Sequence, residues 1–352
     1  MTAHGNSTSK THLAACVDSR PRRWRLLFAV AAALALMATV STGPAQARSL
    51  CGTKNPTAAP RHVLIVMLEN RSYHQVIGNS AAPFENSLAK ACGVATSMWG
   101  VTHSSAANYL AVSFGQYPSG SVHGCNYAAC ASSATSVYQQ LDSAGRGWKA
   151  YEEAMPSACD KSNGPLYKIG HNPPIFSTGI SSSECAARDV PVTSLTARSG
   201  AFWNDLHAGH LRAVSWITPD TSNDGEASCG GSCGLSLADS WLQKFISLVA
   251  ESSEYRSGST AIFVTYDEGT GADAKIGEDC TDKAADLARS QPSCHVPLFV
   301  IYPGTKPGAR SGTFFDHYSL TRAVEDFFGL GYLAHAADPQ TVSLANHFGL
   351  VK

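Results

Sequence analysis

Short apolar runs alternate along the chain with stretches that have the residue spacing of amphipathic helices. The apolar runs span residues 63–68, 94–100, 211–218, 261–266 and 296–302. Continuous apolar strands separated by helices are typical of a parallel sheet that is covered on both faces. The chain therefore predicts a single α/β domain with a mostly parallel central sheet flanked by helices.

Two helices are the clearest. One face of the first carries apolar residues at helical spacing, namely Leu237, Trp241, Leu242, Phe245, Ile246 and Val249. The second is expected from His317 to Phe328 with Asp316 as its N-cap. Three stretches rich in Gly, Ser, Pro and Cys, at 116–135, 155–190 and 219–236, exceed ordinary connection lengths. Such loops, stapled by disulfides, are expected to build a pocket.

The N-terminal segment has the pattern of a secretory signal peptide. Arg20, Arg22, Arg23 and Arg25 precede the apolar residues 26–40 and the small-residue site Ala45-Gln46-Ala47. The apolar stretch is fifteen residues long, and a membrane span needs roughly 20, so no stable membrane anchor is expected. Residues 1–47 are therefore predicted to be a signal peptide and residues 48–352 the mature domain of a secreted protein. The "RRWRLL" sequence partly resembles a twin-arginine signal, as an alternative to the general secretory route.

The charge balance of the mature chain argues against a partner bound through bulk charge. Residues 1–47 contain five of the 26 basic and one of the 27 acidic residues. Their removal leaves 21 basic and 26 acidic residues, a formal net charge of −5. Nucleic acid and anionic membrane surfaces attract strongly basic proteins. We therefore expect no nucleic-acid partner.

The cysteines predict a disulfide framework. Of eleven cysteines, Cys16 lies in the signal segment, which leaves an even ten in an exported chain. Spacing favours Cys125–Cys130, Cys159–Cys185, Cys229–Cys233 and Cys280–Cys294, with Cys51 and Cys92 left for each other, although sequence alone does not fix connectivity. Oxidised cysteines do not ligate zinc as thiolates. Any metal should therefore have oxygen and imidazole ligands.

Two apolar runs end in oxygen-bearing side chains. Residues 63–68 are followed by Glu69 and Asn70, and residues 261–266 by Asp267 and Glu268. The carboxyl ends of parallel strands meet at one edge of a sheet, where α/β proteins bind ligands. Together, the four residues predict a site for one divalent ion: Ca²⁺, Mg²⁺ or Mn²⁺, with Zn²⁺ also fitting.

A serine follows a third run. In "VTHSSAANYLAV", Ser105 is expected at the N-terminus of a helix that starts near Ala106. A helix N-terminus attracts anions, and a hydroxyl beside a cation can lose its proton and attack phosphorus. Helix capping is the alternative interpretation of this serine.

An ordered set of motifs resembles a known family. The motifs are "ENRSYHQVIG", "THSSAANYLA", "YKIGHNPPIF", "TPDTSNDGE", "LADSWLQKF", "VTYDEG", "HVPLFVIYPG" and "DHYSLTRAVEDFFGL". In this order they resemble the bacterial phosphoesterase family of acid phosphatases and phospholipases C, in the alkaline phosphatase superfamily. The resemblance covers residues 62 to about 330.

The resemblance implies a secreted, metal-dependent phosphoric ester hydrolase with a phosphoseryl intermediate. It implies that Glu69, Asn70, Asp267 and Glu268 hold the metal and that Ser105 is the nucleophile. His171 and His317 match family histidines that line the phosphate site, where imidazolium groups would offset phosphoryl charge. The substrate would be a small phosphomonoester, or a phospholipid headgroup if the chain acts like the phospholipases C.

The chain departs from the family pattern at two places. Where the family has "HPSxPNY", this chain has "HSSAANY", which makes Ser104 a second candidate nucleophile beside Ser105 and leaves Asn108 in place. Where the family has "NDGH" or "NDMH", this chain has Glu226 after Asn223 and Asp224. A carboxylate there repels a phosphate dianion unless it is protonated or turned toward the cation. Asn108, Asn223, Asp224 and Glu226 are therefore additional site candidates.

Other interpretations remain open at this level. Glu226 leaves room for a phosphodiester substrate, or for a secreted binding module whose metal is structural. Residues 230–234, "GGSCG", formally fit a serine-esterase motif but follow a polar loop and contain a cysteine. A sulfatase would need a C/S-x-P-x-R sequence, which the chain lacks. His103 and His295 lie beside motifs and are left open between packing and the site.

Overall fold

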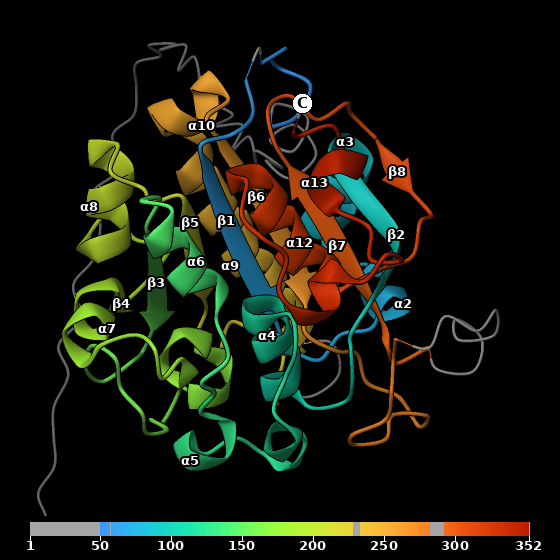
Figure 1. Ribbon diagram of the computed structural model, residues 1–352. Helices are drawn as coiled ribbons and strands as arrows, with labels where there is room; N and C mark the ends of the chain where they lie inside the picture. The colour runs from blue at the N-terminus through green and yellow to red at the C-terminus, as the bar shows by residue number, and fades with distance from the viewer. Residues whose placement is uncertain (1–49, 57, 228–232, 282–291, 352) are drawn as a thin grey trace, which may run out of the picture. The chain divides into compact units, whose positions relative to one another are not determined.

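A computed structural model of the chain describes residues 50–56, 58–227, 233–281 and 292–351 (Figure 1). The expected signal peptide, residues 1–47, lies outside these residues. The strands are β1 (His62–Leu68), β2 (Gly93–Trp99), β3 (Trp148–Glu153), β4 (Asp189–Val192), β5 (Val214–Thr218), β6 (Thr260–Tyr266), β7 (His295–Ile301), β8 (Arg310–Ser311) and β9 (Phe315–Asp316).

The α-helices are α2 (Tyr73–Val76), α3 (Pro83–Ala91), α4 (Ser105–Phe114), α5 (Tyr127–Cys130), α6 (Val137–Ser143), α7 (Ser182–Arg188), α8 (Gly200–Ala208), α9 (Cys233–Ala250), α10 (Ser253–Ser257), α12 (His317–Phe328) and α13 (Leu344–His347). The 3-10 helices are η1 (Ser119–His123), η2 (Ile169–His171), η3 (Pro173–Phe176) and η4 (Ala334–Ala337). None of the helices in the described ranges has the length and apolar character needed to cross a membrane.

One sheet runs through the domain, as the sequence predicts. Its strand order is β4-β3-β5-β1-β6-β7-β2-β8, and β9 also pairs with β2. β7 runs antiparallel to its neighbours β6 and β2, whereas the other paired strands are parallel. An apolar run carries no information on strand direction, so the sequence did not reveal this reversal.

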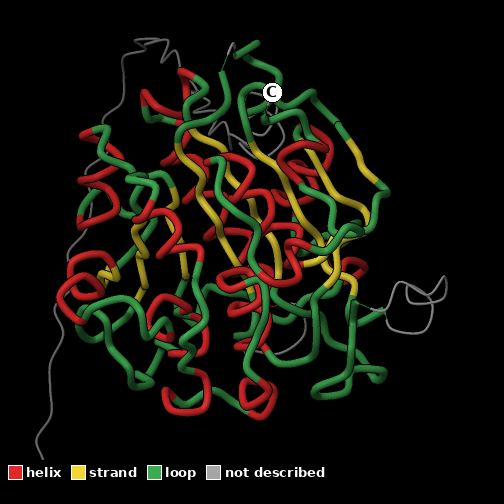
Figure 2. The backbone as a smooth tube through the Cα atoms, viewed as in Figure 1, coloured by secondary structure: helices red, strands yellow, loops and turns green. Residues whose placement is uncertain are grey.

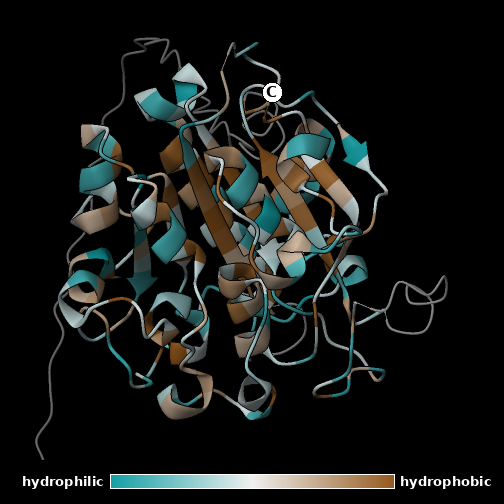
Figure 3. Ribbon diagram, in the orientation of Figure 1, coloured by the Kyte–Doolittle hydropathy of each residue, from teal (hydrophilic) through white to brown (hydrophobic). Residues whose placement is uncertain are grey.

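The central strands are continuous apolar segments because both of their faces are covered. β1 is buried from Val63 to Leu68, and β6 is buried throughout. Figure 3 shows these strands as the most hydrophobic part of the fold. β3 and β4 were not predicted, because "WKAYEE" and "DVPV" carry charged residues and a proline.

Helices cover both faces of the sheet. α4, α6 and α12 pack against one another in front of the sheet in Figure 1, and α3, α9 and α10 lie behind it. α12 confirms its predicted bounds: the Asp316 side chain accepts a hydrogen bond from the amide of Ser319, and the helix ends at Gly329 with φ 64°. α9 is longer than expected, and the prediction that Leu237 faces the core is wrong, since this side chain is 40% exposed.

The long loops gather at one end of the sheet, at the lower side of the view in Figure 2. Four expected disulfides are present: Cys51–Cys92, Cys125–Cys130, Cys159–Cys185 and Cys280–Cys294. The expected Cys229–Cys233 pair falls outside the described residues because Cys229 does. Cys125–Cys130, Cys159–Cys185 and Cys280–Cys294 lie in loops that follow strands or helices at this end, whereas Cys51–Cys92 joins the segment before β1 to the residue before β2.

Candidate active site

The carboxyl ends of β1 and β6 bring the first two predicted ligands together. The strands are parallel neighbours in a register that pairs Leu68 with Tyr266, so Glu69 and Asp267 follow at the same level. The backbone amide of Asn70 donates to Oδ1 of Asp267 at 2.9 Å. Asn70 has φ 55°, a left-handed conformation that asparagine tolerates better than most residues. Both strand ends therefore converge on one point.

Glu69 is fully buried and is the centre of this cluster. Its Oε2 accepts hydrogen bonds from the Ser105 hydroxyl at 2.8 Å and from Nδ2 of Asn70 at 3.1 Å. Its Oε1 lies 3.5 Å from Nε2 of His171. One carboxylate thus touches the candidate nucleophile, a candidate ligand and a candidate phosphate-site histidine.

Asp224 joins the cluster from the loop after β5. Its carbonyl accepts a hydrogen bond from the amide of Glu69 at 2.8 Å, and its side chain is buried. Gly225 follows with φ 113°, and a Cβ there would lie 2.8 Å from the carbonyl oxygen of Glu69. Only glycine permits this backbone so close to β1. The sequence listed Asp224 as an additional site candidate, and the structure places it beside Glu69.

The cluster has the donor atoms that a hard cation needs. Among the described residues, Oε1 of Glu69, Oδ2 of Asp224 and Oδ2 of Asp267 are buried oxygens without a hydrogen-bond partner. Burial raises the pKa of Glu69, and the charges of Asp267 and Asp224 raise it further. Burial likewise raises the pKa of Asp267, and raises that of Asp224 to about 7. A divalent cation would offset this crowding of buried carboxylates, so these residues fit a metal.

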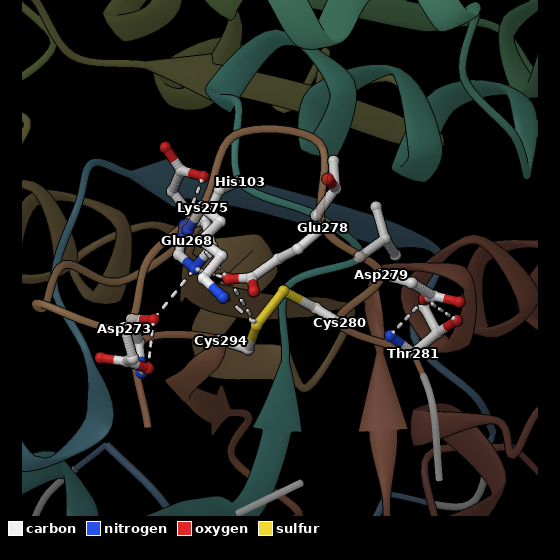
Figure 4. The surroundings of a disulfide bond; sticks show 12 residues. His103, Glu268, Asp273, Lys275, Glu278, Asp279, Cys280, Thr281 and Cys294 are labelled. Atoms are coloured by element: carbon white, nitrogen blue, oxygen red, sulfur yellow. Dashed lines mark hydrogen bonds and ion pairs between the residues drawn. A yellow bond between two sulfur atoms is a disulfide. The ribbon is translucent and has the colours of Figure 1, made fainter. Parts of the chain in front are cut away.

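Glu268 lies in a different network. Its Oε2 is 3.1 Å from Nδ1 of His103, while Nε2 of His103 lies 3.1 Å from Oε1 of Glu278 and 3.0 Å from Oγ of Ser293 (Figure 4). In the part of the chain that the structure describes, neither Glu69, Asp267 and Glu268 nor Glu69, Asp267 and Asp224 bring their ligand atoms within 4.8 Å of one another. Asp224 is linked to Glu69 by its backbone carbonyl and by charge, whereas the side chain of Glu268 contacts His103.

Two groups of potential ligands do meet that distance, and each contains disulfide cysteines. They are His103, Glu278, Cys280 and Cys294, and Cys159, Cys185 and Asp189. A cysteine in a disulfide has no thiolate to offer a metal. Neither group is therefore a better candidate than the carboxylate cluster.

The start of α4 presents Ser105 to this cluster. Ser104 is the N-cap, and its hydroxyl donates away from the carboxylates, to the carbonyl of Ser121 at 2.7 Å. Asn108 holds the connection: its Oδ1 accepts from the amide of Val101 at 2.8 Å, and its Nδ2 donates to the carbonyl of Thr102 at 2.8 Å. The side-chain bonds of Asn108 thus fix the turn that carries Ser105.

His171 comes from η2 and faces Glu69. Its ring stacks on Tyr109 of α4, with centroids 5.0 Å apart and planes at 11°. Burial, and to a smaller extent the charge of the nearby Lys168, lower the pKa of His171 to about 3. This imidazole is therefore neutral above that pH, in contrast to the cationic role expected from the sequence, and acts as a hydrogen-bonding group.

His317, the first residue of α12, lies on the other side of Asp267. Its Nε2 donates to the carbonyl of Asp267 at 2.6 Å. Its Nδ1 is buried and has no partner among the described residues. Burial lowers the pKa of His317 to about 4, so this ring also presents a neutral nitrogen lone pair to its surroundings.

The remaining candidates have separate positions. Asn223 donates through Nδ2 to Asp220 at 3.1 Å and so shapes its own loop. Glu226 is exposed, and its amide donates to Oδ1 of Asp224 at 2.9 Å. His295 is a packing residue, since it stacks between Tyr73 and Trp99. Residues 230–232 of the esterase-like match lie outside the described residues.

Two cavities adjoin Ser104. The small cavity, about 280 Å³, is lined by Ser104, Ser105, Ala106, Gly124, Cys125, Asn163, Lys168, Gly170, His171 and Glu226. The large cavity, about 540 Å³, is lined by Asn70, His103, Ser104, Val122, His123, Gly124, Glu268, Gly269, Thr270, Gly271, Ala274 and Ile276. The candidate nucleophile opens into the small cavity, and predicted ligands Asn70 and Glu268 line the large one.

Two positioning residues escaped the sequence analysis. Tyr109 stacks on His171, and Thr218 at the end of β5 shares its hydroxyl hydrogen between Oε1 of Glu152 and the carbonyl of His171, at 3.0 and 3.3 Å. Tyr109 lies within the quoted "THSSAANYLA" motif, four residues after Ser105, so helical spacing could have placed it on the same face. Thr218 begins the quoted "TPDTSNDGE" motif at the end of the predicted run 211–218, so its place at a strand end could have singled it out.

The fold is that of the alkaline phosphatase superfamily. A member of that superfamily from Vibrio parahaemolyticus superposes with a TM-score of 0.52 at 13% identity, over 84% of this chain and 78% of that one. The lipoteichoic acid synthase LtaP from Listeria monocytogenes superposes with a TM-score of 0.55 at 12% identity, over 85% and 81% of the two chains. At such identities the likeness concerns the fold.

The sequence places the chain within that class. Residues 79–331 match the model of the Phosphoesterase family, and the chain belongs to this family. The match begins after Glu69 and Asn70 and includes Ser105, Asp267 and His317. The family identifies the chain as a hydrolase of phosphoric esters, as the resemblance implied.

Named relatives agree with this class. A phosphatidylinositol-3-phosphatase from Mycobacterium tuberculosis is 26% identical over 90% of this chain and 94% of its own length. A probable acid phosphatase from Kluyveromyces lactis is 25% identical over 82% of this chain. The chain spans 63% of the Kluyveromyces protein and 58% of an acid phosphatase from Aspergillus niger, less than two thirds of each.

Proposed function

We propose that the chain is a secreted, metal-dependent phosphoric ester hydrolase that acts on phosphate monoesters with Ser105 as its nucleophile. The observation that carries the proposal is the 2.8 Å hydrogen bond from Ser105 to Glu69, within a cluster of three buried carboxylates. A serine that only caps a helix would accept a hydrogen bond from an amide of that helix. Within the described part of the chain, neither Ser104 nor Ser105 makes such a side-chain bond to α4. The relatives named as phosphatases support a monoester substrate.

Glu69, Asp267 and Asp224 would hold the ion through their unpartnered oxygens, with Asn70, Glu268 and His317 as the adjoining candidates. The ion, one of Ca²⁺, Mg²⁺, Mn²⁺ or Zn²⁺, would supply positive charge that acidifies a nearby hydroxyl and offsets phosphoryl charge. Zn²⁺ would favour an imidazole such as His317 among its ligands, whereas Ca²⁺ and Mg²⁺ favour oxygen alone.

The protein's own groups would perform the rest of the reaction. The amide groups at the start of α4 attract the anionic phosphoryl group, and Lys168 adds a positive charge in the small cavity. Ser105 Oγ would attack phosphorus, forming a P–O bond to serine while the ester P–O bond breaks. The serine proton ends on the departing alcohol, and water then releases phosphate and regenerates the hydroxyl.

His171 would act in this scheme as a neutral hydrogen-bond donor. Its ring is held between Tyr109 and Glu69 and lines the small cavity with Ser105. A donor that is already fixed by stacking loses little freedom when phosphate binds. It would therefore stabilise the transition state more than freely moving water molecules would. His171 thus orients a phosphoryl oxygen without carrying charge.

Export of the protein is part of the proposal. It rests on the signal-peptide pattern of residues 1–47 and on the disulfides, which persist in oxidising compartments.

The test is hydrolysis of 4-nitrophenyl phosphate and of 4-nitrophenylphosphocholine by wild type, Ser105→Ala and Ser104→Ala, with and without chelator. Ser183→Ala, an exposed serine on α7, serves as the control. We expect turnover of the monoester by wild type and its loss in Ser105→Ala and after chelation. Loss in Ser104→Ala alone would reassign the nucleophile. An inactive, metal-loaded wild type would favour the binding-module interpretation.

A phosphodiester substrate is the second candidate. Glu226 is exposed and lines the small cavity together with Ser105 and His171. A carboxylate at this place repels a dianionic monoester but would pair with a cationic substituent such as choline. Faster hydrolysis of the phosphocholine diester than of the monoester, reversed in Glu226→Gln, would establish this candidate.

A further inference from the structure

We propose that the large cavity binds the apolar part of the alcohol in the substrate, so that the enzyme prefers phosphate esters of alkyl or aryl alcohols. The inference rests on the proposed function and specifies its substrate class. It is carried by three features of the cavity: the chemistry of its walls, the attachment of both walls to the turn before Ser105, and its separation from the charged small cavity.

One side of the large cavity is apolar. Val122 comes from η1, and Ala274 and Ile276 come from the loop after β6. Ile276 is 74% exposed, the highest value among the large hydrophobic residues that the structure describes as exposed. The glycines in the wall contribute backbone only, so about 540 Å³ stays open. The rest of the lining carries polar side chains, namely Asn70, His103, Ser104, His123, Glu268 and Thr270. A cavity of this size that combines an apolar side with convergent polar groups is typical of a site for a small organic group.

Both walls are fastened to the turn that leads to Ser105. On one side, the Ser104 hydroxyl bonds to the carbonyl of Ser121 at 2.7 Å. On the other side, the amide of Gly277 donates to the carbonyl of His103 at 3.0 Å, and the amide of Cys280 donates to the carbonyl of Val101 at 3.1 Å. The walls are thus built around the residues that immediately precede the candidate nucleophile.

The second wall has further support. His103 contacts both Glu268 and Glu278, and the Cys280–Cys294 disulfide ties the loop to the start of β7 (Figure 4). A wall held by the two carboxylate contacts of His103 and by a covalent link keeps its shape when a ligand enters. A preformed apolar site binds without an ordering cost, which favours affinity.

The side chains of the two cavities indicate which part of the substrate each would bind. The small cavity holds Ser105, His171 and Lys168, together with the exposed Glu226, and the phosphoryl group must lie there because Ser105 does. Among the described residues that line the large cavity there is no lysine or arginine, and its titratable side chains are His103, His123 and Glu268. An uncharged hydrocarbon group in that cavity would displace water from Val122, Ala274 and Ile276. Ser104 and Gly124 line both cavities, which places the two parts of one ester side by side.

The experiment compares kcat/KM for ethyl, butyl, hexyl and octyl phosphate. Their alcohols leave with nearly equal ease, so a rising rate reports binding of the chain. We expect wild-type kcat/KM to rise with chain length, by up to about fourfold for each buried methylene group. Short-chain phosphatidic acid, below its critical micelle concentration, tests whether the acyl portion of a lipid uses the same cavity. Butyl phosphate represents the esters of small water-soluble alcohols.

Two variants locate the effect. Ile276→Ser and Val122→Ser are expected to lower the octyl-to-ethyl ratio of kcat/KM by about tenfold or more each, because each removes one apolar wall. Leu237→Ser is the control, since this side chain is 40% exposed on α9 and lines neither cavity. It should leave the ratio as in wild type.

Each outcome has a distinct meaning. A wild type that hydrolyses no ester would overturn the proposed function. Equal kcat/KM for ethyl and octyl phosphate, or equal losses on both in Ile276→Ser and Val122→Ser, would overturn the cavity assignment while the hydrolase stands. A chain-length preference that both variants reduce supports the assignment. A higher kcat/KM for phosphatidic acid than for the alkyl phosphates would then identify a lipid as the source of the apolar group, and the reverse order would identify a simple alcohol.

Discussion

Oγ of Ser105 and Oε2 of Glu69 are joined by a 2.8 Å hydrogen bond that links the first turn of α4 to the carboxyl end of β1. The two residues are 36 positions apart in sequence, and each is held separately: Ser105 by the turn that Asn108 fixes, and Glu69 by its place directly after the central strand β1. A candidate nucleophile and a candidate ligand thus share one proton. Metal binding and catalysis should therefore respond to the same substitutions.

Glu69→Gln should remove bound metal and lower kcat/KM by at least about 100-fold, because a neutral amide replaces the central carboxylate of the cluster. The fold should survive, since the pKa of Glu69 is raised by burial and by the charges of Asp267 and Asp224, and the substitution relieves that repulsion. Metal content by mass spectrometry, steady-state kinetics and circular dichroism check this. Glu251→Gln, on the half-exposed pair with Arg198, is the control. Unchanged metal content and activity in Glu69→Gln would contradict the ligand assignment.

Metal should also stabilise the protein. Addition of the correct ion to chelated wild type should raise the free energy of unfolding by about 2.7 kcal/mol at 100 times its Kd, because the ion binds the folded carboxylates and not the unfolded chain. Differential scanning calorimetry with Ca²⁺, Mg²⁺, Mn²⁺ and Zn²⁺ in turn measures the shift. Asp267→Asn should lose most of it, since this substitution removes a charge and a buried unpartnered oxygen. If none of the four ions raises Tm in wild type, the site is not a metal site.

The buried carboxyl pair behind His171 predicts a pH dependence of stability. Burial raises the pKa of Asp189 to about 7, and burial together with Asp189 raises that of Glu152. In the unfolded chain, an aspartate titrates near its ordinary value of about 3.9. The folded state therefore binds more protons between about pH 4 and 7, and stability should fall as pH rises through that window.

Asp189→Asn should flatten this dependence, because the amide stays neutral and can still accept the hydrogen bond that Nδ2 of Asn172 donates. Urea unfolding at intervals from pH 4.5 to 7.5 gives the free energies. Asp279→Asn, in an exposed loop, is the control that should retain the wild-type slope. An equal slope in wild type and Asp189→Asn would show that this carboxyl is ionised throughout.

Tyr109 should act through the position of His171. Tyr109→Leu removes the ring that stacks on this imidazole at 5.0 Å and should lower kcat/KM by about tenfold. Tyr109→Phe keeps the ring, so its kcat/KM should fall much less. Comparison of the two variants separates the effect of stacking from that of the hydroxyl contact with the carbonyl of Met67. Thermal unfolding of both variants separates a folding defect from misplacement. Equal losses in the two variants would assign the effect to the hydroxyl.

The sheet could be predicted from the sequence because its central strands are buried on both faces. Continuous apolar runs identified β1 and β6, and the acidic residues at their ends located the site. The charged β3 and the short β4 lack that signal, and the direction of β7 depends on chain connection rather than on its own composition. Strand identity was therefore easier to predict than sheet topology.

The proximity of the strand-end residues could be predicted, but the contacts of their side chains could not. Residues adjacent to strand ends must lie at one edge, which placed Glu69 and Asp267 correctly in space. Tertiary contacts decide where such residues lie, so the contact of the Glu268 side chain with His103 and the backbone bond between Asp224 and Glu69 had no sequence signal. The neutral state of His171 likewise follows from burial, which a motif does not report.

The Cys125–Cys130 and Cys280–Cys294 disulfides lie beside the two walls of the large cavity, one next to Gly124 and one at the end of the 268–280 loop. The central sheet contains no such link and can form from its apolar strands alone. A chain that folds before its cysteines are oxidised would therefore have its central sheet, but the loops that line the large cavity would not yet be fixed. If the chain is exported as proposed, the loops that line the cavity would take their final form only after the passage from a reducing to an oxidising compartment.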